Sequence, residues 1–129
     1  MLVLYNRSMF LKAIAPMNFL RRRINPNNFV ITRNQVAKLS NCNPSRIIRW
    51  ERWKYVLWVH IEGWGGYFIS YRKLEQWIAA CSTLIRSCRN IKELKVVWRA
   101  IKKEAKRYTP EALSRLEKLW QQRTEYLTS

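Results

Sequence analysis

The side chains with the clearest chemistry are Ser45, Arg46 and Arg49, which follow Asn43 and Pro44. Asn at the N-cap and Pro at the first helical position are typical of a helix start, so we expect a helix to begin here. An arginine near the start of such a helix can donate two hydrogen bonds to a guanine, and a serine can bind a base edge or a phosphate. The pattern predicts a base-reading helix. The alternative is a helix surface that is merely basic.

The chain has few of the acidic and imidazole side chains that enzymes use, which disfavours catalysis. The chain has no Asp, its first Glu is Glu51, and His60 is its single His. Metal-dependent nucleases need clustered carboxylates for their divalent ions, and a single His cannot supply a general-base or zinc scheme that needs several imidazoles. We therefore expect no enzyme, no catalytic or metal-binding residue and no cofactor, with His60 as a structural residue of a strand.

The charge of the chain indicates a polyanionic partner. Its 129 residues include 25 Lys and Arg against 8 acids, a formal net charge of +17. Nucleic acid and anionic lipid are the two polyanions to weigh. No stretch is long and apolar enough to span a membrane, so we expect nucleic acid and no membrane partner.

The cysteines indicate a reducing compartment. Cys42, Cys81 and Cys88 form an odd set without close pairing, which argues against a disulfide-stapled secreted domain. We expect a cytoplasmic protein associated with the prokaryotic nucleoid. Buried thiols are the ordinary outcome, and a thiol sensor is the alternative.

The elements that position Ser45, Arg46 and Arg49 begin at Thr32, an N-cap with Gln35 three residues on. The helix that follows should end near Leu39. Asn41 should then occupy the turn position with positive φ, where Gly is usual and Asn is the next-best residue. Together with the helix after Asn43, this stretch predicts a helix-turn-helix.

A β-hairpin should follow. Residues 55–61 are rich in β-branched and aromatic side chains, and all three glycines of the chain fall within residues 63–66, before a short strand at 67–69. Trp64 would be exposed at the tip, where an aromatic ring can enter a groove or pack on a sugar. A nucleotide-binding glycine loop is the competing interpretation, but the spacing matches no such motif.

Other basic residues are expected to contact the phosphate backbone. Arg52 and Lys54 lie beyond the base-reading positions and suit phosphates. Arg21, Arg22 and Arg23 form the densest basic run, ahead of a turn at residues 25–28. These three are either an arm that reaches phosphates or a minor groove, or a solvated basic turn.

The C-terminal part predicts three helices. Ser70 caps one that runs to about Ser87, Asn90 caps one that ends at Tyr108, and Thr109 with Pro110 begins the last. The last two form a helical hairpin whose apolar stripes need a cover, either the preceding domain or a second copy. The expected dimerisation residues are Ile91, Leu94, Trp98, Ile101, Leu113, Leu116 and Trp120.

The same hairpin is strongly basic, which raises a rival interpretation as an amphipathic helix lying on a membrane. The cations concerned are Lys92, Lys95, Arg99, Lys102, Lys103, Lys106 and Arg107. The capped, paired layout favours the dimerisation interpretation.

These stretches point to a family. Residues 31–40 (ITRNQVAKLS) with 43–51 (NPSRIIRWE) resemble the winged helix-turn-helix of MerR-type regulators and phage excisionases, and residues 67–77 (YFISYRKLEQW) resemble their post-wing strand and helix. In size and layout the chain is similar to the short MerR-type repressors of CRISPR-associated transposons. The resemblance covers about a third of the chain.

The resemblance implies roles for particular residues. Ser45, Arg46 and Arg49 would read bases, Trp50 would lie near a phosphate, and the wing around Trp64 would touch the backbone or minor groove. Arg33, within the similar stretch, is counted with the DNA-binding residues. The C-terminal region is too short and too basic for an effector domain, so no small-molecule effector is expected.

The expected fold is mainly α with a small β-hairpin, a winged helix-turn-helix followed by a C-terminal helical hairpin. Residues 1–28 form a basic N-terminal segment, 29–88 the DNA-binding domain and 89–129 the dimerisation hairpin. We expect a sequence-specific regulator that binds double-stranded DNA as a homodimer and acts as a repressor on a palindromic operator. Two alternatives are an excisionase-like DNA-bending factor of a mobile element and a basic adaptor for RNA or protein.

Overall fold

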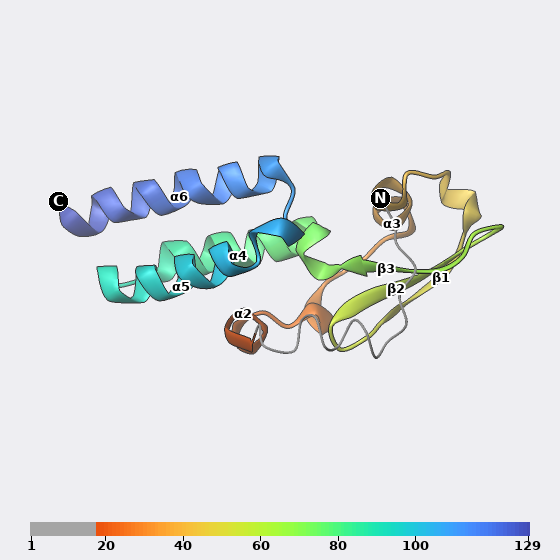
Figure 1. The fold of residues 1–129 in the computed structure, drawn as a ribbon, viewed down its shortest axis with the longest axis horizontal. Helices are drawn as coiled ribbons and strands as arrows, with labels where there is room; N and C mark the ends of the chain where they lie inside the picture. Colours follow the sequence, from red (N-terminus) through yellow and green to blue (C-terminus); the bar gives the residue numbers. More distant parts are fainter. Residues whose placement is uncertain (1–17) are drawn as a thin grey trace. The chain divides into compact units, whose positions relative to one another are not determined.

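The computed structural model describes residues 18–129, which fall into two compact units (Figure 1). Among these residues, unit 1 contains 25–71 and unit 2 contains 18–24 and 72–129. The division at Tyr71 assigns the helix after the sheet to unit 2. The first 17 residues of the predicted basic N-terminal segment lie outside the described part of the chain.

Unit 1 is a helix and a three-stranded antiparallel sheet in the order β1-β2-β3. Trp50 of β1 lies opposite Val59 of β2, which in turn lies opposite Tyr67 of β3. The elements are η1 (Pro26–Asn28), α3 (Arg33–Ser40), η2 (Pro44–Arg46), β1 (Ile47–Arg52), β2 (Val56–Ile61) and β3 (Gly65–Ser70).

The predicted base-reading helix is wrong, because most of its residues form strand β1. Its start signal is present: the Asn43 side chain accepts a hydrogen bond from the Ser45 amide at 3.0 Å. After a single 3-10 turn, however, the chain enters β1 at Ile47 and pairs with β2. The β-branched and aromatic side chains that follow favour a strand once a partner strand is available. The helix-turn-helix is therefore replaced by a helix followed by a sheet.

The first helix and its turn are confirmed. The Thr32 hydroxyl accepts a hydrogen bond from the Gln35 amide at 3.2 Å, so Thr32 caps α3. Asn41 ends the helix in the left-handed region, with φ 55° and ψ 48°. The backbone N–H of Asn41 donates hydrogen bonds to the carbonyls of Ala37 and Lys38. This cap lets the chain reverse direction immediately after α3.

The predicted hairpin is also confirmed, as the connection between β2 and β3. Gly63 and Gly65 take φ values of +80° and +88°, a region that other residues rarely adopt. Trp64 between them is 42% exposed, as expected for a residue at the tip.

One face of the sheet forms the core of unit 1. Leu57, Val59 and Ile61 alternate along β2 and are each 0% exposed. Helix α3 contacts η2 and β1, and its Val36 is also fully buried. Trp58 and His60, which point to the opposite face, are half-buried.

Unit 2 is a bundle in which α4, α5 and α6 pack pairwise and α2 packs on α5 (Figure 1). Its helices are α2 (Asn18–Arg23), α4 (Glu75–Ser87), α5 (Ile91–Lys103), η4 (Ala105–Arg107) and α6 (Pro110–Thr128), while η3 (Tyr71–Lys73) joins the two units.

The predicted N-caps Asn90 and Thr109 are confirmed, since each side chain accepts a hydrogen bond from an amide three residues on. The predicted cap at Ser70 is wrong. Ser70 is the last residue of β3, and α4 begins at Glu75 after η3, because pairing with β2 extends the strand to that point. Helix α5 ends at Lys103 instead of Tyr108, and the 3-10 turn η4 follows.

A polar network lies inside unit 2. Arg72 donates two hydrogen bonds to Glu104, at 3.1 and 2.9 Å, and both side chains are almost fully buried. The Tyr108 hydroxyl donates to Glu104 at 2.7 Å and accepts from the Trp77 indole at 3.0 Å. The network links the start of α4 with η4 and the segment before α6.

Candidate nucleic-acid interface

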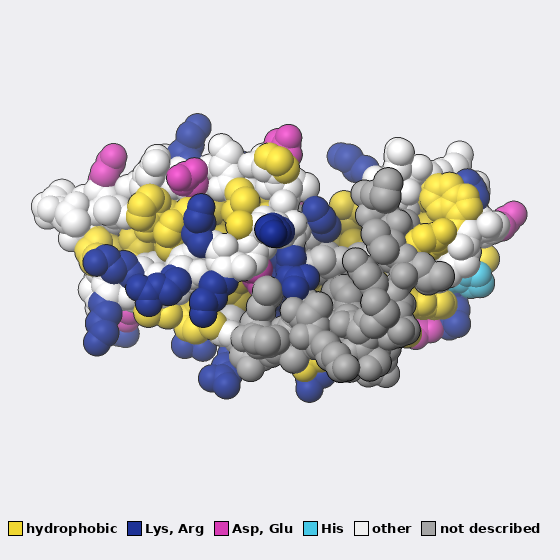
Figure 2. Space-filling view, viewed as in Figure 1, with side chains coloured by type: hydrophobic (Ala, Val, Ile, Leu, Met, Phe, Trp, Pro, Cys, Tyr) yellow, Lys and Arg dark blue, Asp and Glu magenta, His cyan; other side chains and the backbone are white. Residues whose placement is uncertain are grey.

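The clearest charged surface lies on α5. Five cations occupy positions spaced by three, four, three and one residues, which places them on one face of the helix. All five are exposed, whereas Leu94, Val97 and Ile101 on the opposite face are at most 7% exposed. Figure 2 shows Lys and Arg side chains gathered along α5. We call this set the basic row: Lys92, Lys95, Arg99, Lys102 and Lys103.

The acidic residues near α5 do not neutralise the basic row. Glu93 accepts hydrogen bonds from the backbone and side chain of Arg89, which hold the pKa of its carboxyl below the usual value. Glu104 is buried against Arg72. Within residues 18–129, no cation of the row makes an ion pair. Its positive charges therefore face solvent without compensation.

The arginine run predicted from the sequence lies in the same unit as the basic row. Arg21, Arg22 and Arg23 end α2, which packs on α5. Arg22 and Arg23 are exposed, and the Arg23 guanidinium lies 4.7 Å from the centre of the Phe19 ring. Helix α2 therefore adds two exposed cations to unit 2.

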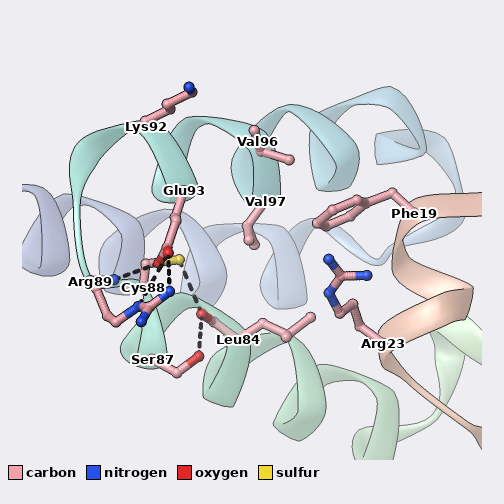
Figure 3. A pocket seen from close by; sticks show the side chains of 10 residues that line it. All are labelled: Phe19, Arg23, Leu84, Ser87, Cys88, Arg89, Lys92, Glu93, Val96 and Val97. Carbon is pink, nitrogen blue, oxygen red and sulfur yellow. Dashed lines mark hydrogen bonds and ion pairs between the residues drawn. The ribbon is translucent and has the colours of Figure 1, made fainter.

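A hollow of about 460 Å³ separates part of α2 from α4 and α5. In Figure 3, Phe19 and Arg23 reach from α2 toward Leu84 and Val97. Its floor is apolar, while cations from α2, the α4–α5 loop and α5 stand at the rim. The lining residues are Phe19, Arg23, Leu84, Ser87, Cys88, Arg89, Lys92, Glu93, Val96 and Val97.

Three of the arginines predicted to contact DNA hold unit 1 together. Arg46 donates to the Glu62 carbonyl at 2.7 Å, and its guanidinium lies 4.3 Å from the centre of the Trp64 ring. Arg33 donates to a backbone carbonyl of β1 and lies 5.7 Å from the Trp50 ring. Arg52 donates to the Phe29 carbonyl at 2.7 Å.

Other predicted contact residues lie on different parts of unit 1. Arg49 is exposed on β1, pairs with Glu51 at 2.6 Å and lies 5.0 Å from the Trp58 ring. Ser45 is exposed in η2, and Lys54 is exposed in the turn between β1 and β2. The structure therefore does not bring these residues together on one recognition helix.

The residues expected to form a dimer fall into two groups. Leu94, Ile101 and Leu116 are at most 1% exposed, because α4 covers the stripes of α5 and α6. The other four are half-buried, and the rings of Trp98 and Trp120 stack with centroids 5.2 Å apart. Dimerisation stays a prediction, and a second copy would have to contact the half-buried group: Ile91, Trp98, Leu113 and Trp120.

The sequence interpretation did not assign the basic row to DNA. It noted the same cations only as a mark of a membrane-lying helix. Their spacing by three and four residues along one face was the signal that could have separated a phosphate-binding surface from a uniformly basic helix.

The described residues show neither a metal cluster nor a membrane-spanning helix. Within residues 18–129, no group of three or more His, Cys, Asp or Glu side chains is placed to hold a metal ion. None of the described helices is both long and apolar enough to cross a membrane.

No family model, curated protein or solved structure matches this chain. The resemblance to MerR-type regulators and excisionases therefore stays a prediction.

Proposed function

We propose that this protein binds double-stranded DNA through the basic row of unit 2 and acts without catalysis as a DNA-binding regulator. The observation that carries the proposal is the set of five exposed cations on one face of α5, none of them paired with an acid in the described chain. Such a surface gains affinity from the release of counterions that are condensed on the phosphates.

The dimensions of the basic row suit a duplex. From Lys92 to Lys103 the helix rises roughly 16 Å at 1.5 Å per residue. A duplex carries one charge per 1.7 Å of its axis when both strands are counted. A stretch of this length therefore presents roughly ten phosphates, about five on each strand. Five long, flexible cations can therefore all find a phosphate. Arg22 and Arg23 of α2, which packs on α5, add two more exposed cations to unit 2.

Burial of the apolar face of α5 disfavours a membrane-lying helix. Such a helix needs an apolar face that can enter the acyl boundary. Leu94, Val97 and Ile101 instead pack inside unit 2. Attraction to an anionic lipid surface by charge alone is the competing explanation that the experiment has to address.

A second role, as an architectural factor, is favoured by one observation. The residues predicted to form a recognition helix form the single 3-10 turn η2 and strand β1 instead, so the described chain offers no α-helix at these positions for base reading. Phosphate contacts position a protein on DNA but carry no sequence information. A protein that binds mainly through phosphates suits DNA bending or packaging at least as well as repression of one operator.

The test compares two triple variants with the same change in charge. Lys95→Gln/Arg99→Gln/Lys102→Gln removes the centre of the basic row, while Lys38→Gln/Arg86→Gln/Lys118→Gln removes exposed cations from three other elements. Binding of a labelled duplex is measured by fluorescence anisotropy. We expect the row variant to lose affinity on the order of tenfold or more, and the control variant to lose much less.

Flotation with anionic vesicles, with and without competing duplex, provides a further arm. Equal losses in the two variants would show that binding follows net charge alone and would overturn the proposal. Tighter binding to vesicles than to duplex would also contradict it.

A further inference from the structure

The hollow between α2, α4 and α5 has the size of a small-molecule site. Its volume of about 460 Å³ lies within the range of roughly 300–1,000 Å³ that ligand pockets occupy. Its lining comes from α2, from the end of α4 with the loop that follows, and from the first half of α5. The hollow therefore belongs to the packing of three segments of unit 2, and its shape is not that of a single helix surface.

Part of the lining is an apolar surface that the protein leaves uncovered. Val96 is 43% exposed, and Phe19 and Leu84 are half-buried. Val97 and Cys88 add two buried side chains to the same lining. Covering exposed aliphatic surface lowers the free energy roughly in proportion to the area that is removed from water. A ligand with an aliphatic body would gain affinity here.

Most polar groups of the lining are already paired with each other, as the dashed lines in Figure 3 show. The Ser87 hydroxyl and the Cys88 thiol both donate to the Leu84 carbonyl, at 3.0 and 3.2 Å. The Glu93 carboxylate accepts hydrogen bonds from the backbone amide of Arg89 at 2.8 Å and from its guanidinium at 3.0 and 3.2 Å. These groups therefore need no ligand.

Arg23 is the exception. Within residues 18–129 its guanidinium makes no ion pair and donates no hydrogen bond, and it lies 4.7 Å from the centre of the Phe19 ring. In Figure 3 this guanidinium points from α2 into the hollow, whereas the ammonium group of Lys92 points away from it. The contact with the ring leaves the N–H donors of Arg23 available to a ligand. A cation that faces an apolar lining selects an anion with an apolar body.

We propose that the hollow binds a small aliphatic carboxylate, with its carboxylate on Arg23 and its alkyl chain on Leu84, Val96 and Val97. A guanidinium presents two parallel N–H donors that match the two oxygens of a carboxylate. One available cation suits one anionic group, which disfavours a nucleotide or another polyphosphate as the ligand.

A small-molecule ligand was not expected from the C-terminal region alone. The hollow is completed by α2, however, which precedes the sheet in the chain. Binding of a carboxylate here goes beyond the proposed DNA contact and does not depend on it, because the ligand is titrated without DNA.

The experiment is isothermal titration calorimetry of the full chain with octanoate. Two matched ligands separate the two halves of the site: octan-1-ol has a chain of the same length without the charge, and acetate has the charge without the chain. Octanoate should bind at one site per chain. It should bind on the order of tenfold or more tightly than either matched ligand, because each of them lacks one of the two contacts.

A pair of charge variants tests the anchor. Arg23→Gln should weaken octanoate binding on the order of tenfold, as expected for loss of a charge-assisted hydrogen bond, and should leave octan-1-ol binding unchanged. Arg22→Gln removes the same charge from an exposed neighbour on α2 that does not line the hollow, and it should have a much smaller effect.

A pair of tryptophan variants tests the space. Val96→Trp enlarges an exposed side chain of the lining and should weaken both octanoate and octan-1-ol, because the ring takes the place of the alkyl chain. Thr83→Trp adds the same ring at an exposed position of α4 outside the lining, and it should keep both affinities.

Nuclear magnetic resonance of the ¹⁵N-labelled wild-type protein locates the site even if a variant fails to fold. Octanoate should shift the amide signals of Leu84, Cys88 and Val97. Shifts confined to other parts of the chain would overturn the inference, as would equal affinity for octanoate and octan-1-ol or the absence of saturable binding. Equal losses in folded Arg23→Gln and Arg22→Gln proteins would overturn it as well.

Discussion

At the scale of residues, the buried pair of Arg72 and Glu104 dominates the interior of unit 2. Both side chains are at most 2% exposed, and Glu104 also accepts a hydrogen bond from Tyr108. Burying such a charge is costly unless its partner remains in place. Each member of the pair therefore depends on the other.

Glu104→Gln should destabilise unit 2 by about 3–5 kcal/mol, because it leaves the Arg72 guanidinium buried without a counter-charge. Urea unfolding followed by circular dichroism measures the change. The matched variant Glu75→Gln removes a carboxylate from the exposed pair with Arg115 and should cost far less. Equal losses would contradict the interpretation that burial sets the importance of the pair.

The exposed pair of Glu75 and Arg115 predicts a pH dependence. The hydrogen bond from Arg115 lowers the pKa of the Glu75 carboxyl from its ordinary value of 4.5. A lowered folded-state pKa adds stability above pH 4.5, and this contribution is lost as the pH falls through the folded-state pKa. The stability difference between the wild-type protein and Arg115→Gln should therefore be present at pH 7 and shrink toward pH 3. A difference that stays constant over this range would refute the assignment.

The thiols fit a structural role. Burial raises the pKa of the Cys81 thiol to about 12, so little thiolate exists at neutral pH. Desolvation also raises the pKa of Cys88. The thiol-sensor interpretation loses support, since a sensor needs an accessible thiolate.

At the scale of elements, α5 positions the basic row, and Asn90 defines where α5 begins. The Asn90 side chain accepts a hydrogen bond from the Glu93 amide at 2.9 Å. Asn90→Ala should destabilise unit 2 by about 1 kcal/mol, as expected for loss of an N-cap. Thermal unfolding measures the loss. Asn34→Ala, an exposed substitution inside α3, is the control and should have a smaller effect.

The elements that could be predicted from the sequence are those with local signals. Thr32, Asn90 and Thr109 each supply an oxygen to an amide three residues on, and Gly63 and Gly65 each permit positive φ. These interactions form within a few residues, so short-range patterns suffice to find them.

Strand β1 could not be predicted in the same way. Asn43 and Pro44 begin a 3-10 turn as readily as an α-helix, and the chain beyond them contains both helix-compatible and strand-compatible residues. The choice is made by pairing with β2, across the turn at residues 53–55. The neighbours of Trp58 on the sheet could not be predicted for the same reason, because the strand register places Glu51 and Phe68 beside it.

At the scale of the whole molecule, the two units carry different features. Unit 2 presents cations on α2 and α5, and unit 1 holds the stacked rings of Trp53 and Trp58. Helix α4 covers the apolar stripes of α5 and α6. These stripes therefore no longer require a second copy of the chain as a cover. Dimerisation is therefore not a condition for folding. Light scattering on the full chain measures whether the predicted homodimer forms.

The central claim is that the basic row of unit 2 contacts DNA phosphates, and the salt dependence of duplex binding tests it most directly. The logarithm of the binding constant falls with the logarithm of salt concentration by about 0.9 for each phosphate contact. Lys95→Gln/Arg99→Gln/Lys102→Gln should flatten this slope by roughly 2.7. Lys38→Gln/Arg86→Gln/Lys118→Gln should leave the slope close to that of the wild-type protein. An unchanged slope in the row variant, or the same change in both variants, would contradict the claim.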